Sequence, residues 1–225
     1  MTAKTTNRLF VKFCGFTCMD DLTTAITLGV DAVGLVFYPP SPRFVDFDTA
    51  RTLVASLPPF VSVVALVVNM TDDEFMRLTD TVPFDVVQFH GNETAQDCQR
   101  LARLAKKRWY KAIRVQDGDT AESLLTQINE LKAFGASGVL LDAYHPDKFG
   151  GTGQTFDWTK IPTNSPLPII LAGGLTPDNV ASIAQNELAH RLYGLDISGG
   201  IEREKGIKCA EKMTSFIHHS NFSQT

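Results

Sequence analysis

The sequence has few cysteines, no long hydrophobic run and no excess of positive charge, and each absence excludes a class of protein. Its four cysteines do not suggest a disulfide framework, and the C-x3-C spacing of Cys14 and Cys18 matches neither a redox pair nor a common zinc site. No apolar run reaches the ~18 residues needed to span a bilayer. The first ten residues lack the apolar segment of a secretory signal. We therefore expect a cytoplasmic protein with no membrane partner and no metal.

The formal net charge of −4 leaves no global positive field that would gather nucleic acid or anionic lipid. We expect no nucleic-acid partner. An anionic ligand would have to be held by individual arginine or lysine side chains and by backbone amides of glycine-rich loops.

The whole sequence is 44% hydrophobic and 20% charged, so it has ample apolar material for one large core. Short β-branched runs alternate with amphipathic stretches. The expected strands cover residues 9–15, 32–38, 61–68, 85–90, 110–115, 138–144, 168–174 and 192–200. The expected helices lie near residues 19–28, 46–56, 71–80, 93–106, 120–134, 176–187 and 204–218, and the link 145–160 is mostly loop with at most a short helix.

Eight strands separated by helices indicate a parallel sheet of βα units. Continuous apolar strands such as VSVVALVV suit a sheet that is covered on both faces. Eight repeats in 225 residues fit a (β/α)8 barrel, the TIM-barrel fold, better than the alternative of a doubly wound, flavodoxin-like sheet. No linker is apparent, so we expect one domain spanning residues 1–225.

Polar side chains gather at the carboxyl ends of the expected strands, where barrel enzymes carry their active sites. The set comprises Lys12, Cys14, Arg43, Asn69, Gln88, His90, Asp142, Asp196 and Ser198. Residues two apart in a strand share a face. Lys12 with Cys14, Gln88 with His90, and Asp196 with Ser198 are therefore each expected to point into the barrel mouth together.

Two glycine-rich turns follow the last two strands, at Gly173–Gly174 and at Ser198–Gly199–Gly200. Glycine lets backbone N–H groups approach an anion closely, and barrel enzymes often bind phosphate at this pair of loops. A third glycine-rich stretch, containing Gly153, is expected to border the same site. We expect a phosphate site here, although glycines that only form tight turns would give the same pattern.

The chain resembles phosphoribosylanthranilate isomerases over nearly its full length. The matching motifs, in order, are VKFCG, DAVGLVFYPPSPRFV, VVQFHGNE, LLDAY followed by GGTGQTFDW, ILAGGLTPDNV and LDISGGIE. The chain departs from the family where Gly199 replaces a frequent serine, and where Lys205 and Cys209 replace a common proline and an acidic residue. These departures lie in or after the phosphate loop, away from the residues implied in the chemistry.

The resemblance implies an Amadori rearrangement of N-(5-phosphoribosyl)anthranilate, without metal or cofactor, by an enzyme that is a monomer in mesophiles. Cys14 matches the family's general base and Asp142 its general acid. A thiol of unperturbed pKa near 8.5 is only ~3% ionised at neutral pH, so we expect Lys12 to lower the pKa of Cys14. Asp142 needs burial or a neighbouring anion to raise its pKa.

The same resemblance implies that Arg43 contacts the anthranilate carboxylate, for which its planar guanidinium is suited. Asp196 matches a contact to the bridging amine, and Lys12, Gln88 and His90 are expected close to the substrate. Without the resemblance, three alternative interpretations remain open: Cys14 as a small core residue, Arg43 as a solvated loop cation and Asp196 as a structural residue at a strand end. The rival functions are another phosphosugar barrel isomerase and a catalytically silent phosphate-binding barrel.

Overall fold

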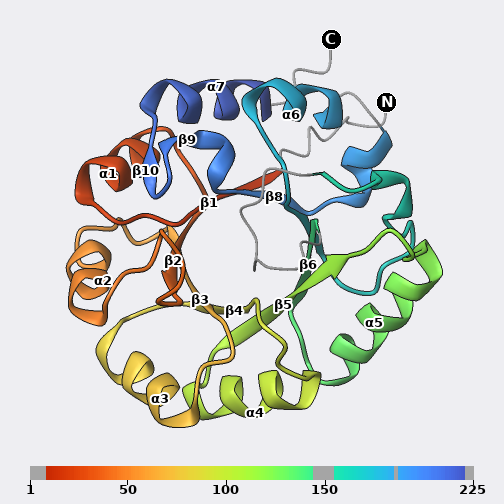
Figure 1. Cartoon of the computed structure of the whole chain (residues 1–225), viewed down its shortest axis with the longest axis horizontal. Helices are drawn as coiled ribbons and strands as arrows, with labels where there is room; N and C mark the ends of the chain where they lie inside the picture. Colours follow the sequence, from red (N-terminus) through yellow and green to blue (C-terminus); the bar gives the residue numbers. More distant parts are fainter. Residues whose placement is uncertain (1–8, 144–154, 185–186, 221–225) are drawn as a thin grey trace, which may run out of the picture.

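The computed structural model describes residues 9–143, 155–184 and 187–220. Eight parallel strands form a closed barrel in sequence order, with the last strand paired to the first. Helices form a ring around it (Figure 1). The strands are β1 (Phe10–Cys14), β2 (Ala32–Phe37), β3 (Ser62–Val67), β4 (Val86–Phe89), β5 (Arg108–Val115), β6 (Gly138–Ala143), β7 (Ile169–Leu171) and β8 (Gly194–Ile197). The predicted (β/α)8 barrel is confirmed.

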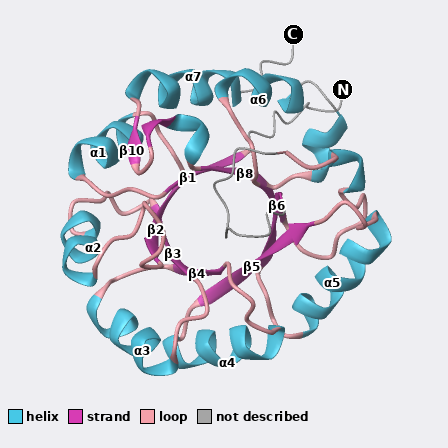
Figure 2. Ribbon diagram, viewed as in Figure 1, coloured by secondary structure: helices cyan, strands magenta, loops and turns pink. Residues whose placement is uncertain are grey.

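The helices alternate with the strands along the chain (Figure 2). They are α1 (Met19–Thr27), α2 (Phe47–Val54), α3 (Asp72–Thr81), α4 (Ala95–Ala105), α5 (Ala121–Ala133), α6 (Pro177–Ala184) and α7 (Ala210–Ser220), with short 3-10 helices η1 (Trp158–Lys160), η2 (Glu187–Arg191) and η3 (Gly199–Ile201). Within the described residues, no helix is long and apolar enough to cross a membrane.

Helix starts follow the capping residues of the sequence. Thr71 accepts a hydrogen bond from the backbone N–H of Glu74, whose side chain accepts in return from Thr71, so α3 begins with a capping box. Thr176 and Asn179 exchange equivalent bonds at the start of α6. These caps place the starts of α3 and α6 just after the loops that follow β3 and β7.

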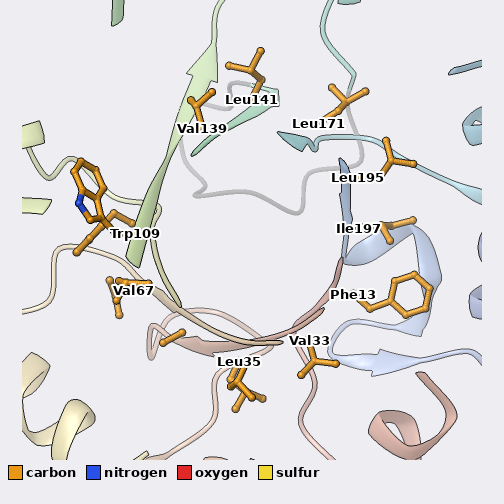
Figure 3. Close-up of a cluster of buried hydrophobic side chains, with 14 of the residues drawn as sticks. Phe13, Val33, Leu35, Val67, Trp109, Val139, Leu141, Leu171, Leu195 and Ile197 are labelled. Atoms are coloured by element: carbon orange, nitrogen blue, oxygen red, sulfur yellow. The ribbon is translucent and has the colours of Figure 1, made fainter. Parts of the chain in front are cut away.

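The alternation of side chains along each strand divides the core into two layers. Outward-facing residues such as Phe13, Leu35 and Leu141 are buried beneath the helices, and Figure 3 shows them pointing away from the barrel centre. Inward-facing residues such as Tyr110 and Leu140 fill the barrel interior. The barrel interior is therefore packed toward the amino ends of the strands, and the inward polar residues lie nearer the carboxyl ends.

The region after β8 corrects two expectations. The strand expected over 192–200 ends at Ile197, because residues 199–201 turn into η3. The helix expected over 204–218 starts only at Ala210; residues 202–208 instead form an antiparallel hairpin of β9 (Glu202–Glu204) and β10 (Ile207–Lys208). Gly206, with φ of 85°, makes the tight turn that a continuous helix would not accommodate.

Candidate active site

The carboxyl ends of the strands surround a pocket of about 200 Å³. Eleven of the expected site residues line it: Cys14, Arg43, Gln88, His90, Asp142, Asp196, Gly173, Gly174, Ser198, Gly199 and Gly200. Lys12 lies deeper and is absent from the lining that the described residues form. Gly153 lies outside the described residues, as does the rest of the third glycine-rich stretch up to residue 154.

Cys14 is the last residue of β1, and its thiol lies next to Gly34 of the neighbouring strand β2. A Cβ atom at position 34 would be 2.6 Å from Cys14 Sγ and 3.1 Å from Lys12 Nζ. The missing side chain at Gly34 therefore makes the space in which the thiol and the ammonium group lie together.

Burial raises the pKa of Cys14, and the nearby Lys12 charge opposes this without reversing it. The expected net lowering of the Cys14 pKa is therefore wrong, although the sign of the Lys12 contribution is right. The thiol form predominates at neutral pH.

Lys12 is 2% exposed, and its Nζ atom donates to Asp196 Oδ2 at 2.6 Å and to Gln88 Oε1 at 2.9 Å. Burial alone would lower the pKa of Lys12, but the Asp196 carboxylate and other neighbours raise it above its ordinary value. Lys12 therefore stays protonated and acts only as a donor. It fixes Gln88 and Asp196 from beneath the pocket.

Gln88 and His90 continue this chain of hydrogen bonds to Asp142. Gln88 Oε1 also accepts from the Tyr110 hydroxyl at 2.8 Å, and burial raises the pKa of Tyr110, so that hydroxyl remains a donor. With its oxygen facing two donors, the Gln88 amide turns its Nε2 toward His90 Nδ1, at 3.0 Å. His90 therefore accepts at Nδ1 and carries its proton at Nε2, which lies 3.2 Å from Asp142 Oδ2.

Asp142 is buried at the end of β6. Its Oδ1 atom accepts from the backbone N–H of Ala143 at 2.9 Å, while Oδ2 faces His90. A Cβ atom at Gly173 would be 2.7 Å from Oδ1, so the turn after β7 approaches this carboxyl closely because it carries glycine. One carboxyl group is thereby held between a histidine and a glycine turn.

Arg43 reaches the pocket from the loop after β2, but its guanidinium is already paired within the protein. Its Nε and Nη2 atoms donate to the two carboxylate oxygens of Glu202, at 2.7 and 2.8 Å. Lys208 Nζ donates to the same carboxylate at 2.9 Å and to the backbone oxygen of Cys14 at 2.6 Å. Burial would raise the pKa of Glu202, but Arg43 and Lys208 hold it below its ordinary value.

Sequence reasoning missed Glu202, Lys208 and Tyr110. Glu202 was expected at the end of a glycine turn and Lys208 in a helix, and no pattern in the sequence marks either as buried. Gly206 was the one available signal, because a glycine between Lys205 and Ile207 indicates a turn rather than a helix interior.

The two glycine turns lie against each other. A Cβ atom at Gly200 would collide with the backbone oxygen of Leu175, so the turn after β8 packs directly on the turn after β7. Gly173 and Gly174 both have positive φ, 81° and 64°. Within the described part of the chain, the N–H groups of Gly173, Gly174, Gly199 and Gly200 donate to no protein acceptor, which leaves them available to an anion.

Comparison with known proteins gives one consistent result. The family described as N-(5'phosphoribosyl)anthranilate (PRA) isomerase matches residues 11–219. N-(5'-phosphoribosyl)anthranilate isomerase from Azotobacter vinelandii is 48% identical over 208 residues, which cover 92% of this chain and 94% of the relative.

Solved structures agree with the sequence match. Phosphoribosyl anthranilate isomerase from Thermotoga maritima aligns with a TM-score of 0.81 at 31% identity, over 94% of this chain and 98% of the other. A phosphoribosyl anthranilate isomerase in complex with reduced 1-(o-carboxyphenylamino)-1-deoxyribulose 5-phosphate aligns with a TM-score of 0.75 at 29% identity, with the same coverage. The resemblance in the motifs is confirmed, and the chain belongs to the phosphoribosylanthranilate isomerase family.

Proposed function

We propose that this protein catalyses the Amadori rearrangement of N-(5-phosphoribosyl)anthranilate to 1-(2-carboxyphenylamino)-1-deoxyribulose 5-phosphate, with Cys14 as general base and Asp142 as general acid. The observation that carries the proposal is the composition of the pocket. A thiol, a carboxyl group and a guanidinium line it together with two glycine turns, and these are the groups that such a substrate requires.

The reaction needs one proton delivered to oxygen and one removed from carbon. Asp142 donates a proton to the furanose ring oxygen, the C1′–O bond breaks, and the amine nitrogen supplies the electron pair that forms a Schiff base. Cys14 then removes the proton at C2′, and the C–H electrons neutralise the iminium nitrogen to give an enolamine. Tautomerisation of the enolamine at C1′ gives the ketose.

The positive charge of the Schiff base opposes the effect of burial, which raises the pKa of Cys14. The thiol is buried, and its raised pKa keeps it predominantly neutral. Ring opening creates a positive iminium group next to the carbon that loses its proton, and a cation within a few ångströms stabilises a thiolate. Lys12 adds a second, permanent positive charge. The base is thus activated at the step in which it acts.

His90 is the group that supports Asp142 as an acid. Its Nε2–H already faces Oδ2, so this hydrogen bond strengthens when proton donation leaves Asp142 as a carboxylate. Gln88, held by Lys12 and Tyr110, keeps His90 in the required tautomer. We propose that Gln88, His90 and Lys12 affect the reaction indirectly, through the side chains of Cys14 and Asp142.

Three features match the rest of the substrate. Arg43 keeps N–H groups that Glu202 does not use, and these suit the anthranilate carboxylate. Asp196 Oδ1 is a buried acceptor with no partner among the described residues, so an N–H of the bridging amine would satisfy it. The amides of the Gly173–Gly174 and Gly199–Gly200 turns, which donate to no acceptor in the described part of the chain, suit the phosphate together with Ser198.

The test is turnover of authentic phosphoribosylanthranilate by the purified protein, followed by the loss of anthranilate-type fluorescence. We expect turnover by the wild-type protein and a fall in kcat of about 10³-fold or more in Cys14→Ser and in Asp142→Asn. Circular dichroism and thermal unfolding serve to establish that both variants fold. No turnover by the wild-type protein would remove the activity, and near-normal rates in either variant would remove that residue's role.

A further inference from the structure

The hairpin of β9 and β10 contacts α1 and the loop between β1 and α1. Thr17 donates to the backbone oxygen of Gly206 at 2.9 Å, and the backbone N–H of Lys208 donates to Asp21 Oδ2 at 2.8 Å. These contacts hold the hairpin beside α1, as Figure 2 shows. The hairpin thereby brings Glu202 and Lys208 behind the pocket wall.

Resting on the proposed function, we propose that Glu202 and Lys208 are positioning residues that aim Arg43 at the ring carboxylate and so set the preference of the site for ring-carboxylated ligands. Glu202 accepts from the Nε and Nη2 atoms of Arg43. A guanidinium has five N–H donors, so two on Nη1 and one on Nη2 are left. These remaining donors form a second bidentate edge, whose direction Glu202 determines.

The stem of Arg43 is fixed as well as its head. A Cβ atom at Gly15, whose φ is 85°, would be 2.5 Å from Arg43 Cδ, so the arginine stem lies directly on the backbone after β1. An arginine that is free in a loop loses rotamer entropy when it binds a ligand. Arg43 loses this entropy on folding, so a carboxylated ligand meets a guanidinium that is already oriented.

Lys208 determines where the Glu202 carboxylate can lie. It is 1% exposed and donates to Glu202 Oε1 at 2.9 Å, to the backbone oxygen of Cys14 at 2.6 Å and to that of Ser198 at 3.2 Å. Of these three partners, Glu202 binds Arg43, Cys14 is the candidate base and Ser198 belongs to the candidate phosphate turn. Lys208 thus keeps the carboxylate-binding group at a fixed distance from the reacting atoms.

The charges of this group also favour an anionic ligand. Glu202 is shared by Arg43 and Lys208, and burial lowers the pKa of Lys208, so Arg43 carries the permanent positive charge of the group. Arg43 is its only member that lines the pocket among the described residues. This charge is therefore presented to the ligand through one oriented guanidinium.

The experiment compares two inert ligands by isothermal titration calorimetry. One is reduced 1-(o-carboxyphenylamino)-1-deoxyribulose 5-phosphate, and the other is the same compound made from aniline, without the ring carboxylate. We expect wild-type protein to bind the carboxylated ligand about tenfold or more tighter, and Glu202→Gln to abolish most of this ratio. Affinity for the aniline compound should change little, whereas general damage to the fold would weaken both ligands alike.

A double-mutant cycle tests whether Glu202 acts through Arg43. Arg43→Ala should abolish the ratio, and adding Glu202→Gln to Arg43→Ala should change it no further. Glu204→Gln, the same chemical change at an exposed position of the hairpin, should leave the ratio unchanged. If Glu202→Gln does not fold, Glu202→Asp keeps the charge beside Lys208 but shortens the reach to Arg43, and it should lower the ratio in the same direction.

The outcomes separate the two proposals. A preserved ratio in folded Glu202→Gln or Glu202→Asp, or an effect of Glu202→Gln that persists in full without Arg43, would overturn the positioning role while leaving the proposed activity intact. Failure of wild-type protein to bind either ligand would overturn the proposed function and this inference with it.

Discussion

Replacement of Gly34 by alanine tests the geometry of the candidate base most directly. The new Cβ atom would be 2.6 Å from Cys14 Sγ and 3.0 Å from Lys12 Cε. Favourable contacts between such atoms occur at about 3.5–4.0 Å, so the sulfur has to move by about 1 Å. Strand β2 has little freedom to retreat, because Gly34 is paired with Cys14 on one side and Val64 on the other.

A displacement of about 1 Å at a reacting atom costs on the order of 10²-fold in rate. We expect Gly34→Ala to lower kcat by about that factor with a small change in KM, because the phosphate turns follow β7 and β8 and Arg43 lies beyond the end of β2, in the loop that follows it. The assay is the fluorescence-based turnover of phosphoribosylanthranilate. Gly118→Ala is the matched control, since no atom lies within 4 Å of a Cβ at that position. A folded Gly34→Ala protein with the kcat of Gly118→Ala would refute the reasoning.

Three further predictions concern pH, stability and phosphate. Because burial raises the pKa of Cys14 and its thiolate is the base, kcat/KM should rise with pH into the alkaline range; Lys12→Met, by removing an opposing charge, should move that rise to higher pH. Phe13→Ala should lower the free energy of unfolding in urea by about 3–5 kcal/mol, since Phe13 is fully buried. Gly200→Ala should push the two glycine turns apart and raise the inhibition constant of inorganic phosphate by about tenfold, with kcat less affected.

Each of these has an outcome that contradicts it. A flat pH profile in the alkaline range would argue against a thiol base. Phe60→Ala is the control for stability, because Phe60 is 95% exposed, and a loss as large as that in Phe13→Ala would show that burial does not govern the effect. Unchanged inhibition by phosphate in Gly200→Ala would argue against the glycine turns as its site.

The sequence predicts the barrel well because its signals are local. Apolar strands, capping residues such as Thr71 and glycine turns each depend on a few neighbouring positions. The alternation of Gln88 with His90 was enough to place both side chains in the pocket. Eleven expected residues line one pocket because the carboxyl ends of all eight strands meet at one end of the barrel.

The interactions behind the pocket were not predictable in the same way. Lys12 bonds to Gln88 and Asp196, which are 76 and 184 positions away, and only the closed barrel brings them together. Lys12 was expected to control the pKa of Cys14, but the expectation omitted burial, which outweighs the lysine charge. Glu202 and Lys208 lie in a hairpin that helical propensity does not predict, because its contacts to Thr17 and Asp21 stabilise it.

The pairing of β8 with β1 has a consequence for synthesis of the chain. The ribosome makes Cys14 long before Asp196 and Lys208, the groups that hold its strand, because these lie 184 positions after Lys12 and 194 positions after Cys14. Until then Lys12 has no carboxylate beside it and stays in water, since an unpaired ammonium group is costly to bury. We therefore expect the thiol to be open to alkylating reagents on a stalled nascent chain and to become shielded when β8 and the β9–β10 hairpin dock.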